Sequence, residues 1–174
     1  NGATAGTVGK NKKVQALKIR LRGQEYTGDI KYSVKAGGED WQKDVISNEI
    51  AGTVGENKYL EAVKVELTGE MKEQYNIYYR VHLSDIGWLD WAVNGNLAGN
   101  EGYNKKIEAI QIQLVKKNGA APGNTDNPYL VKVADIVYQA HVQDIGWQKE
   151  VENGTIAGTT GKNKQLEAVK IKLD

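Results

Sequence analysis

The amino-acid sequence predicts an all-β chain of tandem β-repeats, packed with pseudo-threefold symmetry as in a β-prism or a β-trefoil. Three observations lead to this prediction: landmark residues that recur at fixed spacing, segments in which apolar and polar residues alternate, and the lack of any helical periodicity. One unit of two to four strands is too small to be stable alone, whereas three units together close a core and cover their strand edges.

Each repeat is marked by a tyrosine, a tryptophan, an Ala-Gly pair, a second alanine and a final leucine. In the last repeat these landmarks are Tyr138, Trp147, Ala157-Gly158, Ala168 and Leu173. The same landmarks recur without a gap as Tyr32, Trp41, Ala51-Gly52, Ala62 and Leu67, and as Tyr79, Trp88, Ala98-Gly99, Ala109 and Leu114. The chain opens with Ala5-Gly6, Ala16 and Leu21, which is the second half of a repeat.

This spacing divides the chain into repeats joined by short linkers. We number them repeat 1 (1–22, the C-terminal half of a repeat), repeat 2 (30–68), repeat 3 (76–115) and repeat 4 (136–174). The segment 116–135 carries Pro122 and Pro128 among Gly, Asn and Asp, and is predicted to be a linker or exposed loop. Two arrangements stay open: repeat 1 continues an upstream array, or it closes a ring with repeats 2 and 3 and leaves repeat 4 apart.

The pattern of apolar and polar residues predicts that each full repeat is a hairpin of two long strands. Val169-Lys170-Ile171-Lys172-Leu173 alternates strictly, and the equivalent segments keep their apolar positions while the polar ones vary, which is typical of a sheet with one solvated face. Ala168 has the opposite phase, so a β-bulge is expected there. Asn94-Gly95 and Asn153-Gly154 predict tight turns, because both residue types tolerate positive φ.

Composition excludes several function classes. The 174 residues contain no cysteine, so there is no disulfide framework and no thiolate metal site. A net charge of +1 with interspersed acids and bases argues against a nucleic-acid partner. No apolar run reaches the roughly 20 residues of a membrane span. His82 and His141 share a repeat position without neighbouring ligands, so neither a metal site nor a cofactor is predicted.

The recurring acids do not predict an enzyme. Glu61, Glu108 and Glu167 are equivalent copies of one repeat position. Catalysis by paired carboxylates requires two groups whose different surroundings separate their pKa values. We therefore expect a non-catalytic protein without catalytic residues.

Two sets of aromatic residues are candidates for binding. Trp41, Trp88 and Trp147 recur beside a turn, which favours a core or inter-repeat role, with lining of a ligand site as the alternative. Trp91, Tyr103 and Tyr59 instead break the repeat pattern at positions that are mostly charged in the other repeats. Aromatic side chains at such solvated positions are predicted to contact a partner.

The motif is fullest in repeat 4, where it runs His141-Val142-Gln143-Asp144-Ile145-Gly146-Trp147-Gln148, Asn153-Gly154, Ala157-Gly158-Thr159-Thr160-Gly161 and Leu166-Glu167-Ala168-Val169-Lys170-Ile171. It resembles the ChW repeat, the clostridial hydrophobic repeat with a Gly-Trp signature, and Ser84-Asp85-Ile86-Gly87-Trp88 is close to it. Repeat 2 departs from the pattern, since Asp40 precedes its tryptophan.

The resemblance implies a function outside the cell. Members of this family are typically tandem, often in threes, and occur in secreted and surface proteins of clostridia and related Firmicutes. It therefore implies a secreted or surface-attached, non-catalytic module that binds a host or extracellular protein. Two alternatives stay open: an immunoglobulin-binding surface protein, and a carbohydrate-binding module with one shallow site per repeat near the Gly-Trp turns. A mere spacer between other domains is a third.

Overall fold

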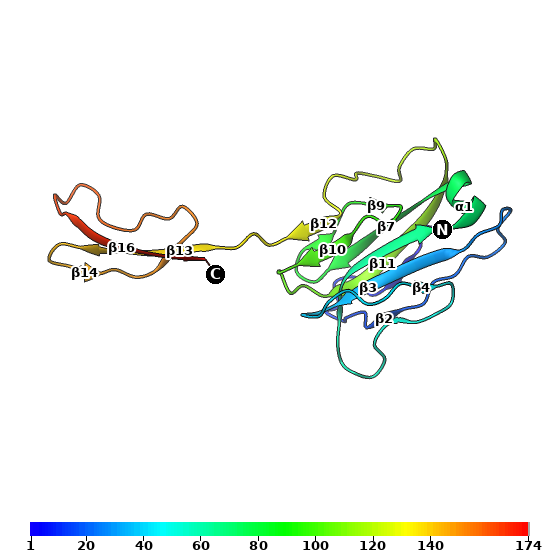
Figure 1. Cartoon of the computed structure of the whole chain (residues 1–174), viewed down its shortest axis with the longest axis horizontal. Coiled ribbons are helices and arrows are strands. Elements are labelled where there is room, and N and C mark those ends of the chain that lie inside the picture. Colours follow the sequence, from blue (N-terminus) through cyan, green and yellow to red (C-terminus); the bar gives the residue numbers. More distant parts are fainter. Residues whose placement is uncertain (174) are drawn as a thin grey trace. The chain divides into compact units, whose positions relative to one another are not determined.

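The computed structural model describes residues 1–173 and confirms an all-β chain of tandem repeats (Figure 1). It divides into a compact unit, Asn1–Lys132, and a second unit that starts at Val133. The first unit holds repeats 1 to 3 and the second holds repeat 4, so the two are described separately.

Each full repeat of the first unit is built on two long antiparallel strands. Repeat 2 pairs β3 (Ile30–Ala36) with β6 (Leu60–Leu67), and repeat 3 pairs β7 (Tyr75–Leu83) with β11 (Ile107–Lys116). The register shifts beside the second alanine in each repeat, which confirms the expected β-bulge.

The chain between the long strands first folds back over the first of them. In repeat 3, β8 (Gly87–Trp88) and β9 (Ala92–Val93) both pair with β7, and in repeat 2, β4 (Val45–Ile46) pairs with β3. A turn with positive φ follows, at Asn94 (48°) or Asn48 (68°), as the Asn-Gly pattern predicts.

The Ala-Gly segments then leave their own repeat and pair with the preceding one. Thus β5 (Ala51–Gly52) pairs with β2 (Ala16–Leu17) of repeat 1, and β10 (Ala98–Glu101) pairs with β6 of repeat 2. The cycle closes where β1 (Thr4–Gly6) of repeat 1 pairs with β11 of repeat 3. Of the two arrangements left open by the sequence, the pairings correspond to the one in which repeat 1 closes a ring with repeats 2 and 3. The sheets stay open, and the pairings alone do not establish prism or trefoil symmetry.

Glycine is required in these exchanged segments because two backbones approach closely. A Cβ at Gly52 would lie 2.3 Å from the carbonyl oxygen of Gln15, and one at Gly99 would lie 2.2 Å from that of Glu61. Both glycines also have a φ above +100°, which side chains rarely allow.

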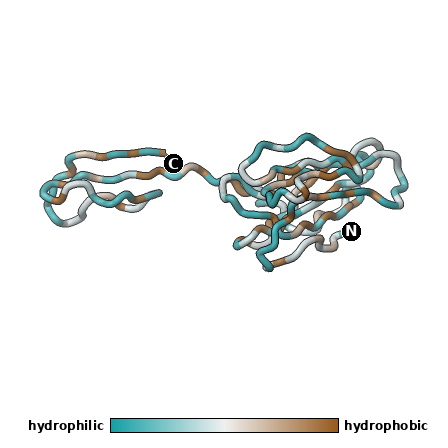
Figure 2. Tube along the Cα trace, turned by 90° about the horizontal axis from the view of Figure 1, so that it is seen from below, coloured by the Kyte–Doolittle hydropathy of each residue, from teal (hydrophilic) through white to brown (hydrophobic). Residues whose placement is uncertain are grey.

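The core of the first unit is built from apolar residues of its three repeats, and Figure 2 shows hydrophobic residues along the chain of this unit. It contains Val65 from repeat 2 and Ile110 from repeat 3, and Leu17 of repeat 1 packs against it. Tyr32 and Tyr79 are fully buried, and their hydroxyl groups donate hydrogen bonds to the carbonyl oxygens of Glu49 and Asn96. The repeated tyrosine therefore ties the start of each repeat to its turn.

Two connecting segments contain regular secondary structure that the sequence did not predict. The linker after repeat 2 contains a short helix, α1 (Gly69–Gln74), which no periodicity indicated because its only buried residue is Met71. After repeat 3 the chain forms β12 (Tyr129–Val131), parallel to β10.

Repeat 4 has the same hairpin design as the others. Its long strands are β13 (Ile136–Val142) and β16 (Leu166–Leu173), and the short strands β14 (Gly146–Trp147) and β15 (Val151–Glu152) pair with β13.

Candidate binding surface

Three equivalent loops, one from each repeat of the first unit, meet around one polar hollow of about 310 Å³. We call it the loop hollow. Lys13, Tyr59 and Lys106, which occupy one and the same repeat position, all line it. The pairing of each Ala-Gly strand with the preceding repeat, which we call the cyclic exchange, explains this convergence. Each of these strands carries the loop that follows it onto the neighbouring repeat.

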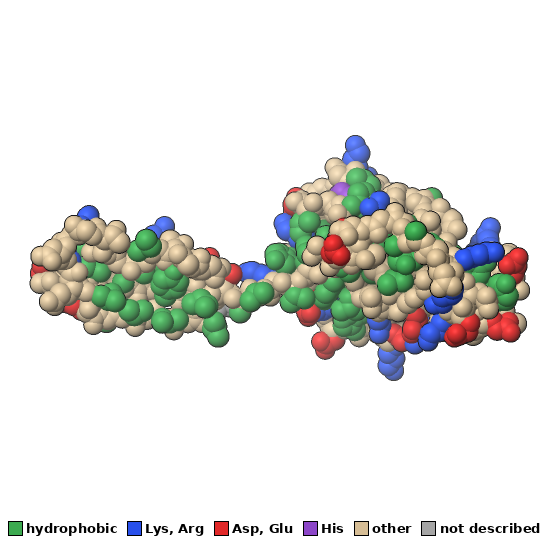
Figure 3. All heavy atoms as spheres, turned by 90° about the horizontal axis from the view of Figure 1, so that it is seen from above, with side chains coloured by type: hydrophobic (Ala, Val, Ile, Leu, Met, Phe, Trp, Pro, Cys, Tyr) green, Lys and Arg blue, Asp and Glu red, His purple; other side chains and the backbone are tan. Residues whose placement is uncertain are grey.

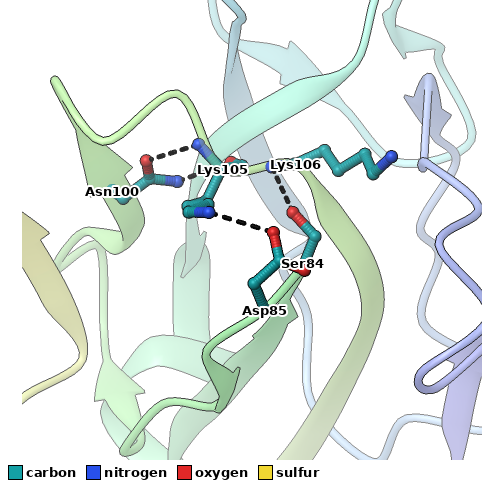
Figure 4. A network of polar contacts seen from close by, with 5 residues as sticks. All are labelled: Ser84, Asp85, Asn100, Lys105 and Lys106. Atoms are coloured by element: carbon teal, nitrogen blue, oxygen red, sulfur yellow. Dashed lines mark hydrogen bonds and ion pairs between the residues drawn. The ribbon is translucent and has the colours of Figure 1, made fainter.

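One wall of the loop hollow is a hydrogen-bonded network (Figure 4). The Asn100 side chain accepts a bond from the Lys105 amide (3.1 Å) and donates to the Lys105 carbonyl (2.7 Å), which fixes the loop 100–105. The Lys105 ammonium lies 2.9 Å from the Asp85 carboxylate, and the Lys106 amide donates to the Ser84 hydroxyl (3.3 Å). The Ser84-Asp85 turn therefore holds the lysine-bearing strand end in place.

A second hollow of about 360 Å³ shares Asn11 and Asp85 with the first. Its wall includes Glu108, which is almost fully buried and accepts a hydrogen bond from the Gly9 amide of repeat 1 (3.2 Å). The Nδ1 atom of His82 lies 3.2 Å from the same carboxylate. Glu108 thus connects repeats 3 and 1.

The position equivalent to Glu108 in repeat 2 is Glu61, which is also buried. Burial raises the pKa of the Glu61 carboxyl above its ordinary range, although the Gly38 amide and Lys35 act in the opposite direction. Burial likewise raises the pKa of the neighbouring Tyr59, and the Glu61 charge adds to that shift.

Two of the three aromatic residues that break the repeat pattern lie on the loops that meet around the loop hollow. Tyr103 is 42% exposed, as the sequence predicts. Tyr59 lines the loop hollow but is half-buried, because its ring packs over Gly37.

The expectation that Trp91 stands at a solvated position is wrong. Trp91 is 5% exposed, and the Arg80 guanidinium lies 4.7 Å from its ring centre. Its amide donates a 2.8 Å hydrogen bond to the Asn124 carbonyl, and Gly123 lies against its indole nitrogen. The segment after repeat 3 covers this side chain. The equivalent positions of the other repeats lack such a cover and carry charged residues, so the comparison between repeats wrongly predicted that Trp91 is exposed to solvent.

Of the expected core or inter-repeat role of the repeated tryptophans, the core part is wrong. Trp41 and Trp88 are half-buried and Trp147 is 42% exposed. A cation lies over each ring: Lys64 at 5.6 Å from Trp41, Arg80 at 4.9 Å from Trp88, and Lys170 at 4.3 Å from Trp147. These tryptophans form part of the solvated face of each hairpin and not of its core.

The sequence analysis did not identify the lining residues Asn11, Asn104 and Asp85 as candidate site residues. A signal was present in the sequence, because Asn11, Asn57, Asn104 and Asn163 recur at one repeat position, and all four have positive φ.

Within residues 1–173, no three His, Asp or Glu side chains are grouped to hold a metal ion. The described residues also include no helix long and apolar enough to cross a membrane.

Comparison with family models confirms the resemblance seen in the sequence. The model described as Clostridial hydrophobic W, ChW, matches residues 1–23, 37–69, 82–116 and 141–174. Comparison with the curated proteins gives no match, and comparison with the solved structures gives none either.

Proposed function

The chain belongs to the Clostridial hydrophobic W family, and from this premise we propose that it is a non-catalytic binding module of a bacterial surface or secreted protein. It acts outside the cell and contacts a host or extracellular protein. Repeats 1 to 3 are arranged about a pseudo-threefold axis, as in a β-prism or β-trefoil, and the convergence of three equivalent loops supports this arrangement.

The observation that supports this function best is the loop hollow with Tyr103 beside it. The hollow is lined by polar side chains and by Tyr59, and a polar rim around an aromatic residue is typical of a protein interface. Tyr103 lies on the same loop as Asn104 and exposes 42% of its surface. Its equivalents are Lys10, Glu56 and Lys162, so the fold does not require an aromatic residue there.

The equivalence of the repeats supplies variants that keep the local structure. Tyr103→Lys introduces the residue of repeats 1 and 4, and Lys106→Gln introduces the residue of repeat 4. Ile46→Lys is the matched control, because Ile46 is an exposed apolar residue on β4, outside the loops.

The experiment measures binding of the chain to arrays of host secreted proteins, including immunoglobulins, and of glycans. Binding to a protein is expected to weaken about tenfold or more in Tyr103→Lys and Lys106→Gln, as for interface anchors, and to stay unchanged in Ile46→Lys. Protein binding that both loop variants retain would contradict the proposed surface. An immunoglobulin as the only protein bound would establish the narrower immunoglobulin-binding function.

A carbohydrate-binding module is the second candidate, and the solvated tryptophans favour it. Trp147 is the most exposed of them, and Lys170 lies over one face of its ring. One shallow site per repeat predicts weak, multivalent glycan binding that survives the loss of any single tryptophan. Binding of this kind, unaffected by Tyr103→Lys, would replace the protein-binding proposal.

A further inference from the structure

The second hollow, of about 360 Å³, is lined by acidic and polar groups of two repeats. We call it the acidic hollow. Repeat 3 supplies Glu108 from β11, His82 from β7 and Asp85 from the turn after β7. The loop of repeat 1 supplies Gly9 and Asn11. The acidic hollow therefore lies where repeat 1 meets repeat 3.

Glu108 is a buried carboxylate without a lysine or arginine beside it. It is 2% exposed, and its Oε2 accepts a hydrogen bond from the Gly9 amide (3.2 Å). Within residues 1–173, the only basic group in ion-pair distance of it is the His82 imidazole. Its Oε1 has no hydrogen-bond partner in that part of the chain and is open to the hollow, whereas Oε1 of the equivalent Glu61 is closed to solvent. A buried carboxylate is normally paired with a cation, so this oxygen is available to a cationic donor.

His82 supplies a second hydrogen-bond acceptor. It is 8% exposed, and its Nδ1 is closed to solvent and lies 3.2 Å from Oε2 of Glu108. Because an ionised carboxylate only accepts hydrogen bonds, Nδ1 carries the proton, and Nε2 of the neutral ring has a lone pair. Among residues 1–173, no side chain or backbone amide donates to this lone pair. Both acceptors suit a ligand that donates hydrogen bonds and carries a positive charge.

The negative charge of the acidic hollow is a local property. Acidic and basic side chains both lie on the face of the first unit shown in Figure 3, so this face as a whole selects neither anions nor cations. At the rim, the Asp85 carboxylate is balanced by the Lys105 ammonium at 2.9 Å, which leaves the Glu108 charge in excess. The residues that line the acidic hollow, all within the described chain, include no lysine or arginine, whereas three lysines line the loop hollow.

We propose that the acidic hollow binds a lysine or arginine side chain of the protein partner. The inference rests on the proposed protein-binding function and specifies the chemistry that the partner presents. An ammonium or guanidinium group only donates hydrogen bonds, and its charge balances that of Glu108. The methylene stem of such a side chain packs against Ile86, an apolar residue of the wall that is 42% exposed. The acidic hollow shares Asn11 and Asp85 with the loop hollow, so one partner surface reaches both.

The experiment is a titration of the whole chain with three tripeptides, blocked at both ends, whose central residue is lysine, arginine or glutamine. The amide signals of Gly9 and Gly87, two residues that line the acidic hollow, report binding in NMR spectra. The two basic peptides are expected to shift both signals saturably, and the glutamine peptide is expected to leave them unchanged. Lack of a saturable shift with both basic peptides would overturn the proposal.

Glu108→Gln removes the charge and keeps an acceptor for the Gly9 amide, and repeat 1 has a glutamine, Gln15, at this position. Its affinity for the basic peptides is expected to fall about tenfold or more, as for a lost charge-assisted hydrogen bond. Glu73→Gln is the matched control, because it removes the same charge from an exposed position on α1. Equal affinities of Glu108→Gln and Glu73→Gln would contradict the cation site.

Asp85→Asn tests the rim without changing a buried side chain. The Asp85 side chain is 74% exposed, and asparagine also tolerates its φ of 62°. The variant leaves the Lys105 ammonium unbalanced beside the hollow, so affinity for the basic peptides is expected to fall about two- to fivefold. If Glu108→Gln does not fold, an unchanged affinity of folded Asp85→Asn overturns the proposal by itself.

The same variants separate this inference from the proposed function. A host protein that Tyr103→Lys binds weakly, and that Glu108→Gln binds as the wild type does, would overturn the cation site and support the proposed surface. Protein binding that is about tenfold weaker in Glu108→Gln and unchanged in Glu73→Gln would support both. Saturable binding of the basic peptides by a chain that binds no host protein would support the cation site and contradict the protein-binding function.

Discussion

Replacing Gly52 by alanine tests the physical basis of the exchange between repeats. Gly52 lies on β5 with a φ of 107°, and a Cβ there would lie 2.3 Å from the Gln15 carbonyl oxygen and 2.7 Å from the Ala16 Cα. Both obstacles are backbone atoms, so rotation of a side chain cannot relieve the collision. The strands β5 and β2 must therefore separate in Gly52→Ala.

The expected cost follows from two contributions. An alanine at this φ costs about 1–3 kcal/mol in backbone strain. Separation of the strands also removes the Thr53-to-Gln15 hydrogen bond (3.0 Å) and weakens the Gly52 amide bond to the Gln42 side chain (2.8 Å), at about 0.5–1.5 kcal/mol each. The free energy of unfolding of the first unit should fall by about 2–6 kcal/mol.

Gly55→Ala is the matched control in the same loop. Gly55 also has positive φ (80°), but nothing lies within 4 Å of its Cβ position, so only a strain of about 1–2 kcal/mol is expected. Urea unfolding followed by circular dichroism measures both variants, and amide exchange of Thr53 reports the exchanged strand directly. Equal losses of stability in Gly52→Ala and Gly55→Ala would refute the close-approach argument.

Two further predictions concern buried side chains. Trp91→Ala should destabilise the first unit by about 3–5 kcal/mol, because it removes a buried indole from beneath the segment after repeat 3; an unchanged unfolding temperature would contradict this. Glu61→Gln, which introduces the residue that repeat 1 has at Gln15, should stabilise the protein at neutral pH. Because burial raises the pKa of Glu61, the folded state retains the proton longer than the unfolded state, and wild-type stability falls as pH rises from the unfolded pKa through the folded one. Unfolding curves from pH 4 upward should show a smaller fall in Glu61→Gln, and an identical pH dependence would contradict the argument.

The repeating part of the fold could be predicted from the sequence because its causes are local. Alternation identified strands such as β16, the opposite phase of Ala168 located a bulge, and Asn94-Gly95 located a turn. Each of these features depends on a few neighbouring residues, and repetition in several copies reinforced the pattern.

The partner of each exchanged strand could not be predicted, because the local pattern of Ala51-Gly52 is the same whichever long strand it joins. The burial of Trp91 escaped for a similar reason. It depends on the Asn124 carbonyl in an irregular segment whose Gly, Asn and Pro residues indicate only a loop. The loop hollow was partly visible through Tyr59, while its lysines and asparagines resembled ordinary solvated residues until the ring brought them together.

The most direct test of the ring is a disulfide between repeats 1 and 3. Thr4 and Gln111 are register partners whose side chains are 2.9 Å apart, and the natural chain has no cysteine to interfere. Cysteines at both positions should form an intramolecular disulfide under mild oxidation. Cysteines at Thr4 and at Lys64, the equivalent of Gln111 in repeat 2, should not. A disulfide in the second pair, or none in the first, would contradict the cyclic exchange.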